Sequence, residues 1–174
     1  MSASYCVFSV GDRRVGISMS SVREIVDIGN IVPVAVPLAP AFVQGLFNLR
    51  GQVLPYLDLS SFVGGQDSHS AAGDRAVVVE RGDFRFATAG QAIDTVQVEE
   101  SAFTPIADAA LFPALDAEAQ SERGAFHVIH LDRLEACLNQ AMRFGDLADV
   151  PVEVEAVSSR NSELSSSAPA ELAP

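Results

Sequence analysis

The chain has 174 residues, of which 48% are hydrophobic, and its 23 acidic and 11 basic residues give a formal net charge of −12. The basic residues are all arginine, because the sequence contains no lysine. An acidic chain lacks the positive surface that attracts nucleic acid or anionic lipid, so we expect neither as a partner. The missing lysine also excludes lysine-dependent phosphate loops and Schiff-base catalysis.

The hydrophobic content predicts a folded domain without a membrane span. A single unit of about 150 residues buries roughly 70% of the surface of its unfolded chain, which is enough for a sizeable core. No apolar run approaches the roughly 20 residues that a membrane-spanning helix needs. The first residues lead directly into a strand-like run, without the pattern of a secretory signal, so we expect a cytoplasmic protein. Cys6 and Cys137 lie in apolar surroundings and are interpreted as small buried hydrophobic residues rather than as a disulfide.

The first predicted element is a β-hairpin, in which residues 5–10 and 14–19 flank the turn pair Gly11-Asp12. The sequence Ser21-Val22-Arg23-Glu24 fits a capping box and predicts a short helix that continues to about Asp27. Prolines alternate with apolar residues over 31–36, which is typical of an edge or irregular strand. One helical turn is expected within 37–44, with Pro40 at its first position.

Residues 45–59 consist of two apolar runs around the polar stretch 48–52. Leu54, Tyr56 and Leu57 predict a strand, and the polar stretch predicts a turn or bulge in which Gly51 can adopt a positive φ. Asn48 can bind nearby backbone groups through its side chain. Arg50 is then a lone cation on a rigid turn, where its planar guanidinium suits a partner's carboxylate or carbonyl groups. The alternative is an ordinary exposed arginine, which needs no functional explanation.

The second half of the chain predicts more short strands and one longer helix. Residues 64–74 have the composition of a loop, and residues 75–81 and 84–88 form the clearest hairpin, around a type II′ turn at Gly82-Asp83. Further strands are expected over 91–99, 115–120 and 125–130, with an irregular stretch at 101–113. Asp132 is expected to cap a helix that ends near Gly145 and places its apolar residues on one face: Leu134, Leu138 and Ala141.

About ten short strands with hairpin turns and two or three short helices favour a mainly β fold made of small barrels over a parallel α/β sheet. We therefore assign residues 1–150 to one folded domain. Residues 151–174 are rich in Ser, Ala, Pro and Glu and lack aromatic residues. We expect this tail to be disordered, because it cannot bury enough apolar surface to offset the entropy of ordering.

The sequence gives little support to an enzyme. His127 and His130 are three residues apart in a predicted strand, so their side chains point to opposite faces and cannot share a metal ion. His69 lies in the expected loop, and no Gly-rich phosphate loop is present. We expect no catalytic residue, metal or cofactor.

The stretch from Gly45 to Leu59 resembles the signature of the CheW-like domain family, in which Gly and two hydrophobic residues precede Asn-Leu-Arg-Gly and a Pro-x-x-Asp-Leu ending. Phe47 and Tyr56 are bulkier variants of the usual aliphatic residues. Other segments are similar to the family in the same order along the chain, from Ser4 to Arg143: Gly16-Ile17, Val22-Arg23-Glu24-Ile25, Pro40 to Gly45, Ile93 to Val96, and Val128 to Leu134.

The resemblance implies two intertwined five-stranded, SH3-like β-barrel subdomains, no catalytic activity and two protein partners. One subdomain would bind the regulatory domain of a CheA-type histidine kinase, and the groove between subdomains would receive the cytoplasmic tip of a chemoreceptor. By position, Val22, Glu24 and Gly45 would face the kinase. The residues that would shape the receptor-facing region are Asn48, Leu49, Arg50 and Gly51. For Glu24, the capping role alone is an equal explanation.

Two departures from the family pattern fall in the second half. Residues 89–92 are more polar than the usual strand, and the segment 104–120 lacks a glycine-bearing strand start and carries Asp116 and Glu118. The function that the resemblance implies is a non-catalytic adaptor that couples chemoreceptors to the kinase in an array at the membrane. The alternative is a CheW-like binding module that senses a ligand, or that competes for receptor or kinase sites without activating the kinase.

Overall fold

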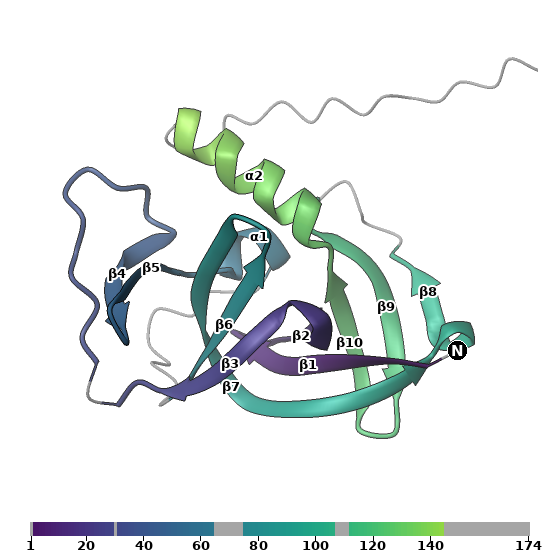
Figure 1. Ribbon diagram of the computed structural model, residues 1–174. Coiled ribbons are helices and arrows are strands. Elements are labelled where there is room, and N and C mark those ends of the chain that lie inside the picture. The colour runs from purple at the N-terminus through teal and green to yellow at the C-terminus, as the bar shows by residue number, and fades with distance from the viewer. Residues whose placement is uncertain (1, 30, 65–74, 107–111, 145–174) are drawn as a thin grey trace, which may run out of the picture.

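The computed structural model describes residues 2–29, 31–64, 75–106 and 112–144 (Figure 1). Within these residues the chain forms ten strands, two α-helices and two short 3₁₀ helices, so the prediction of a mainly β fold is confirmed. Most of the expected loop at 64–74, the helix stop at Gly145 and the tail from residue 151 lie outside the described residues.

The first sheet is built from the two ends of the described chain. β1 (Ser2–Val10) and β2 (Arg13–Ser18) form the predicted hairpin, and β1 also pairs with the second half of β7 (Phe84–Glu99). β2 also pairs in parallel with β10 (Gly124–Ile129), and β10 pairs antiparallel with β9 (Leu115–Ser121). β8 (Phe103–Pro105) follows the 3₁₀ helix η2 (Glu100–Ala102) and completes this sheet beside β9.

The second sheet is built from the residues between these two segments. Its strand order is β3 (Val22–Asp27), β6 (Arg75–Arg81), the first half of β7, β5 (Gln52–Leu57) and β4 (Val43–Leu49). The hairpin of β6 and β7 turns at Gly82-Asp83, where only the glycine has a positive φ, as a type II′ turn requires. Two subdomains therefore share one chain in which the second is inserted into the first.

β7 joins the two sheets, and the sequence predicted two separate strands where the structure has this single one. Residues 84–90 pair with β6, and residues 91–99 pair with β1. At the change of partner Ala92 has a φ of 48°, and the register with β1 shifts between Val7 and Ser9. The polar stretch 89–92 is therefore a bulge within one strand, not a break between two.

Two predicted helices are wrong. The capping-box segment forms the 3₁₀ helix η1 (Met19–Ser21) and then strand β3, because Val22, Ile25 and Val26 are β-branched and pair with β6. Turns at 37–38 and 41–42 replace the expected helical turn, and β4 begins at Val43, whose amide is bound to the carbonyl of Pro40 at 2.8 Å. The irregular strand expected at 31–36 is reduced to one β-bridge, between Val34 and Leu46.

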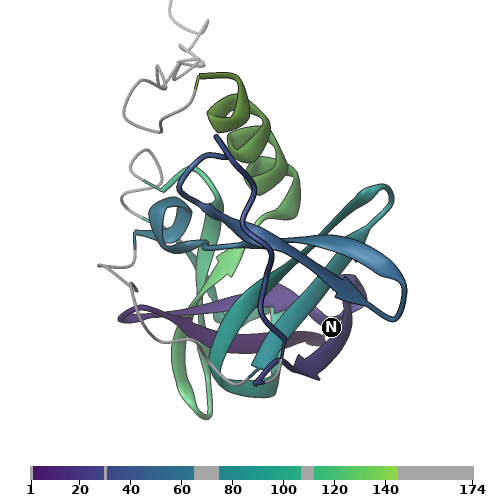
Figure 2. The ribbon, with the colours of Figure 1, turned by 90° about the vertical axis from the view of Figure 1, so that its left-hand side faces the viewer.

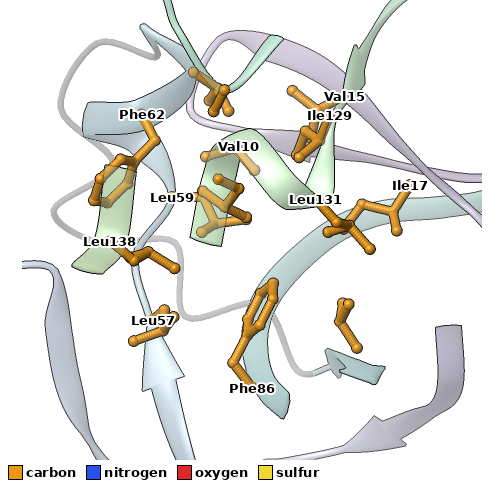
Figure 3. Close-up of a cluster of buried hydrophobic side chains, with 14 of the residues drawn as sticks. Val10, Val15, Ile17, Leu57, Leu59, Phe62, Phe86, Ile129, Leu131 and Leu138 are labelled. Carbon is orange, nitrogen blue, oxygen red and sulfur yellow. The ribbon is translucent and has the colours of Figure 1, made fainter. Parts of the chain in front are cut away.

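The main core lies between the two sheets and the long helix α2 (Leu131–Phe144), as Figures 1 and 3 show. The apolar face predicted for this helix is confirmed, since Leu134, Leu138 and Ala141 are all buried. The short helix α1 (Ser60–Val63) contributes Phe62 to the same core. β6 is buried on both faces, because Val77 belongs to this core and Val78 to a second cluster inside the second sheet. One continuous core thus fixes the two subdomains against each other.

Candidate functional site

The hairpin turn between β4 and β5 consists of Arg50 and Gly51, with φ angles of 51° and 86°. Two positive φ angles in a two-residue loop define a type I′ turn, whose twist matches that of the flanking strands. The side-chain oxygen of Asn48 accepts a hydrogen bond of 2.7 Å from the Gly51 amide, as the sequence predicted. Leu49 is half-buried against the core of the second sheet. The turn is therefore rigid and holds the Arg50 side chain outward.

Arg50 is not the lone cation that the sequence suggested, because it pairs with Glu24 of β3. Its Nη2 lies 3.1 Å from Glu24 Oε2, and its Nη1 donates to Oε1 at 3.4 Å. The Arg50 side chain is 77% exposed and that of Glu24 is 22% exposed. β3 and β4 are the two outer strands in the order of the second sheet, so this pair bridges the edges of the curled sheet. Glu24 caps no helix, and its structural role is this ion pair.

A second charged network crosses the same face of the sheet. Arg23 of β3 donates to Glu80 of β6, Arg85 of β7 contacts Glu80 at 3.0 Å, and Arg85 also donates to Gln52 of β5 at 2.8 Å. The hydrogen bond from Arg23, and after it that from Arg85, holds the pKa of the Glu80 carboxyl below its ordinary value. The sequence alone does not indicate this network, because its members come from four strands and only the strand register brings them together.

These residues surround a shallow pocket of about 180 Å³, lined by Arg23, Glu24, Leu49, Arg50, Gln52, Leu54, Val78 and Arg85. With Glu24 in the lining and Glu80 bound to Arg23 and Arg85, the site has three guanidinium groups against two carboxylates, a small positive excess on a chain whose net charge is −12. Guanidinium groups that are already oriented by ion pairs are suited to bind a carboxylate presented by a partner. The arrangement is chemically able to hold an acidic group, and the residues that line the pocket include no nucleophile.

Gly45 and Val22 lie at a different part of the second sheet. Gly45 is buried on β4 with a φ of 149°, and a Cβ there would lie 2.8 Å from the Val34 carbonyl oxygen and 2.9 Å from Pro33 Cβ. Val22 is half-buried at the start of β3, opposite Val79. Gly45 therefore has no side chain to offer a partner, and it acts by letting residues 33 and 34 pack closely on β4.

Residues 31–38 run over the outside of the second sheet (Figure 2). We refer to them as segment 31–38. Their apolar side chains are exposed at Val32, Val34, Val36 and Leu38. The sequence analysis read this segment only as an irregular strand. One feature of the sequence does mark this segment as unusual, because no charged residue occurs from Ile28 to Leu49 in a chain where charged residues make up 20%.

The histidines and cysteines of the described chain form no reactive centre. His127 Nε2 lies 3.9 Å from Glu118, whereas His130 Nδ1 lies 3.9 Å from Asp132. Across residues 2–29, 31–64, 75–106 and 112–144, no three His, Cys, Asp or Glu side chains are grouped so that they could hold a metal ion. Cys6 and Cys137 are free thiols, and burial raises the pKa of the Cys6 thiol to about 11. No helix in the described part of the chain has the length and apolarity to span a membrane.

Comparison with known proteins supports the resemblance seen in the sequence. A model of the CheW-like domain family matches residues 4–136. The chain is 34% identical to the protein FrzA of Myxococcus xanthus over 115 residues, which cover 66% of this chain and 67% of FrzA. It is 30% identical to a probable chemotaxis protein CheW of Rhizobium etli over 135 residues, which cover 75% of this chain and 79% of that protein.

A shorter match reaches 40% identity over 52 residues with the chemotaxis protein CheW of Treponema pallidum, and it spans only 29% of that protein. The crystal structure of the scaffolding protein TtCheW from Thermoanaerobacter tengcongensis superposes with a TM-score of 0.64 at 21% identity. The superposition covers 75% of this chain and 90% of TtCheW, and it shows that the two folds are alike. The chain belongs to the CheW-like family of adaptor proteins in chemotaxis signalling.

Proposed function

We propose that the protein is a non-catalytic adaptor that couples chemoreceptors to a CheA-type histidine kinase. The observation that carries this proposal is the pocket around Arg50, where three arginines meet on a rigid sheet of a CheW-like domain. A site built from ion-paired guanidinium groups binds acidic side chains, and it contains no group that would act on a substrate. Its chemistry therefore supports binding of a protein rather than catalysis.

In this proposal the two partners use different parts of the second sheet, so the receptor site lies on that sheet and not in the groove between the subdomains that the resemblance implies. The receptor tip contacts the β4–β5 turn through Arg50, with Asn48, Leu49 and Gly51 holding the turn in place. The kinase regulatory domain contacts the part formed by Val22 and by the chain packed on Gly45. Glu24 belongs to both parts, because it lies on β3 beside Val22 and pairs with Arg50. The protein works in the cytoplasm, where receptors bring it to the membrane.

A ternary-complex assay tests the proposal. The full chain is mixed with a CheA-type kinase and a receptor cytoplasmic fragment, and both the assembled complex and the kinase activity are measured. An adaptor binds both partners at once and raises the kinase activity that the receptor controls. Wild-type protein that binds neither partner would contradict the proposal.

The same assay separates the adaptor from the other module classes. A competitor would bind one partner, displace the resident adaptor and lower kinase activity. A ligand sensor would show a ligand-dependent rise in melting temperature, since a ligand that binds only the folded state stabilises it. Either result would replace the proposed function with the corresponding alternative.

A further inference from the structure

The exposed apolar side chains of the described residues are concentrated on segment 31–38. Of the seven large hydrophobic side chains that are exposed there, four belong to this segment: Val32 at 85%, Val34 at 71%, Val36 at 38% and Leu38 at 104%. The bridge to Leu46 and the tight packing on Gly45 hold the backbone of the segment against β4. Apolar residues gathered in this way on a fixed backbone mark a surface on which another segment or molecule packs.

Segment 31–38 lies close to the end of α2, which is the last described element. Figures 1 and 2 both show the chain between β3 and β4 running up to the carboxyl-terminal end of this helix. Phe42, which follows the segment, belongs to the same core cluster as Leu138 and Ala141 of α2. The chain that continues after Phe144 therefore starts near the exposed apolar surface.

The residues after α2 fall into two stretches of different composition. Valine occurs four times in residues 145–174, always within 150–157, whereas all six serines lie from residue 158 onward. Val150, Val152 and Val154 alternate with Pro151, Glu153 and Glu155. Valines at every second position are typical of a strand that buries one face and leaves the other in solvent. The expectation of disorder then applies to the serine-rich remainder.

We propose that residues 150–154 pack in an extended conformation across segment 31–38, with their three valines against its exposed apolar side chains. Val150 is six residues beyond Phe144, and six residues reach about 20 Å when fully extended. In both stretches valine recurs at every second residue, so in extended chains their side chains share a repeat of about 7 Å. This inference is independent of the kinase and of the receptor.

Charge and tethering favour this occupant over a second copy or a separate protein. Segment 31–38 carries no charged residue, so the acidic residues of the stretch meet no repulsion there. Two whole copies, each with a net charge of −12, repel each other. A segment on a short linker has an effective concentration in the millimolar range, against which a separate protein must compete. Residues 150–154 thus act as a cover that any partner of segment 31–38 has to displace.

Thiol labelling in the full chain tests this cover. Val34→Cys places a thiol on the apolar surface, and its reaction with a maleimide is followed by peptide mass spectrometry, which separates it from Cys6 and Cys137. Replacing the three valines of 150–154 together by serine is expected to speed labelling at residue 34 at least about fivefold, because the apolar contact is lost. The rate should not depend on protein concentration, since the cover and the surface belong to one molecule.

Two matched controls accompany this comparison. Glu153→Gln combined with Glu155→Gln changes the same stretch but keeps its valines, so it should leave the labelling rate at residue 34 unchanged. Val53→Cys places a thiol on β5, at a position that is 64% exposed and lies outside segment 31–38. Its labelling rate should be the same with the three valines intact or replaced. Faster labelling that is confined to residue 34 supports the proposal.

Three results would overturn the proposal. Equal labelling rates at residue 34 with the three valines intact and replaced would show that residues 150–154 do not cover the segment. A rate that falls as the protein concentration rises would make a second copy the occupant. Equal acceleration at residues 34 and 53 would show that the valines support the fold as a whole. None of these results bears on the adaptor function, which is tested separately with the kinase and the receptor.

Discussion

The two sheets share one core but differ in charge. Over residues 22–27, 43–57 and 75–90, the second sheet carries five arginines against four acidic residues, which are Glu24, Asp27, Glu80 and Asp83. Over residues 2–18, 91–105 and 115–129, the first sheet carries three arginines against seven acidic residues. A difference in surface charge bears on solubility and on association with other molecules, not on the fold.

In both sheets a mostly exposed arginine pairs with a less exposed carboxylate of another strand. In the first sheet Arg123 pairs with Asp94, and it accepts a hydrogen bond from Arg14 at its backbone carbonyl, so these groups tie the two hairpins together. In the second sheet Arg50 reaches Glu24 with most of its side chain still exposed. Segment 31–38, with its exposed apolar residues, is also part of the second subdomain. Most of the exposed large apolar residues of the described chain, and the pocket lined by three arginines, thus lie in the second subdomain.

The largest loss of stability is expected from substitutions in β6, which contributes side chains to the main core and to the second cluster inside the second sheet. Val77→Asp and Val78→Asp each bury an unpaired carboxylate, at 0% exposure in the wild type, on opposite faces of β6. The cost is several kcal/mol, comparable to the total stability of a domain, so both variants are expected to be unfolded. Val53→Asp, at an exposed position of β5, is the control and should stay folded. Native circular dichroism and melting curves for either core variant would show that β6 is not a two-sided core strand.

Gly45→Ala tests whether segment 31–38 depends on close packing against β4. The added methyl would meet the Val34 carbonyl and Pro33, so we expect a loss of about 1–3 kcal/mol and a lower melting temperature. Gly82 also has a positive φ, but no atom lies within 4 Å of the Cβ that Gly82→Ala would add. This control should therefore lose only the stability that the unfavourable backbone conformation of alanine costs. Equal melting temperatures for the two variants would contradict the packing role of Gly45.

A smaller effect is expected from acid. The pKa of Glu80 is lowered by Arg23, and that of Asp94 is lowered by Arg123, so each carboxylate stabilises the folded state above its ordinary pKa. This contribution is lost as the pH falls below the ordinary pKa, 4.5 for Glu80 and 3.8 for Asp94, and through the lower folded-state pKa of each group. Glu80→Gln and Asp94→Asn should therefore each show a flatter dependence of melting temperature on pH in the acid range. Curves parallel to the wild type would show that these exposed pairs contribute nothing.

Sequence patterns predicted the hairpins and the apolar face of α2 because those features follow from neighbouring residues. The segment 21–27 was predicted wrongly because a capping box is a local pattern, whereas the pairing of β3 with β6 joins residues 48 to 57 positions apart. The continuity of β7 was missed because a polar stretch normally marks a turn. Only the positive φ of Ala92 and the shifted register with β1 keep this strand continuous.

The candidate site could be predicted only in part for the same reason. Asn48 and Gly51 were recognisable because they shape a turn within their own hairpin. The pairing of Arg50 with Glu24 joins residues 26 positions apart, and the network of Arg23, Glu80 and Arg85 depends on the register of three strands. Exposure of segment 31–38 also depends on tertiary structure, since apolar residues in a sequence normally indicate a core.

The variant Arg50→Ala tests most directly whether Arg50 binds the receptor, when its affinity for the receptor fragment is compared with its affinity for the kinase regulatory domain. Binding of the receptor fragment is expected to weaken by about 2 kcal/mol, or roughly 30-fold, because acidic groups of the partner lose their guanidinium. Binding of the kinase regulatory domain and the melting temperature should stay close to wild type, since an exposed ion pair contributes little to stability. A variant that melts many degrees lower while its folded fraction binds the receptor fragment normally would contradict the account, and Arg50 would then be a brace between the edges of the second sheet.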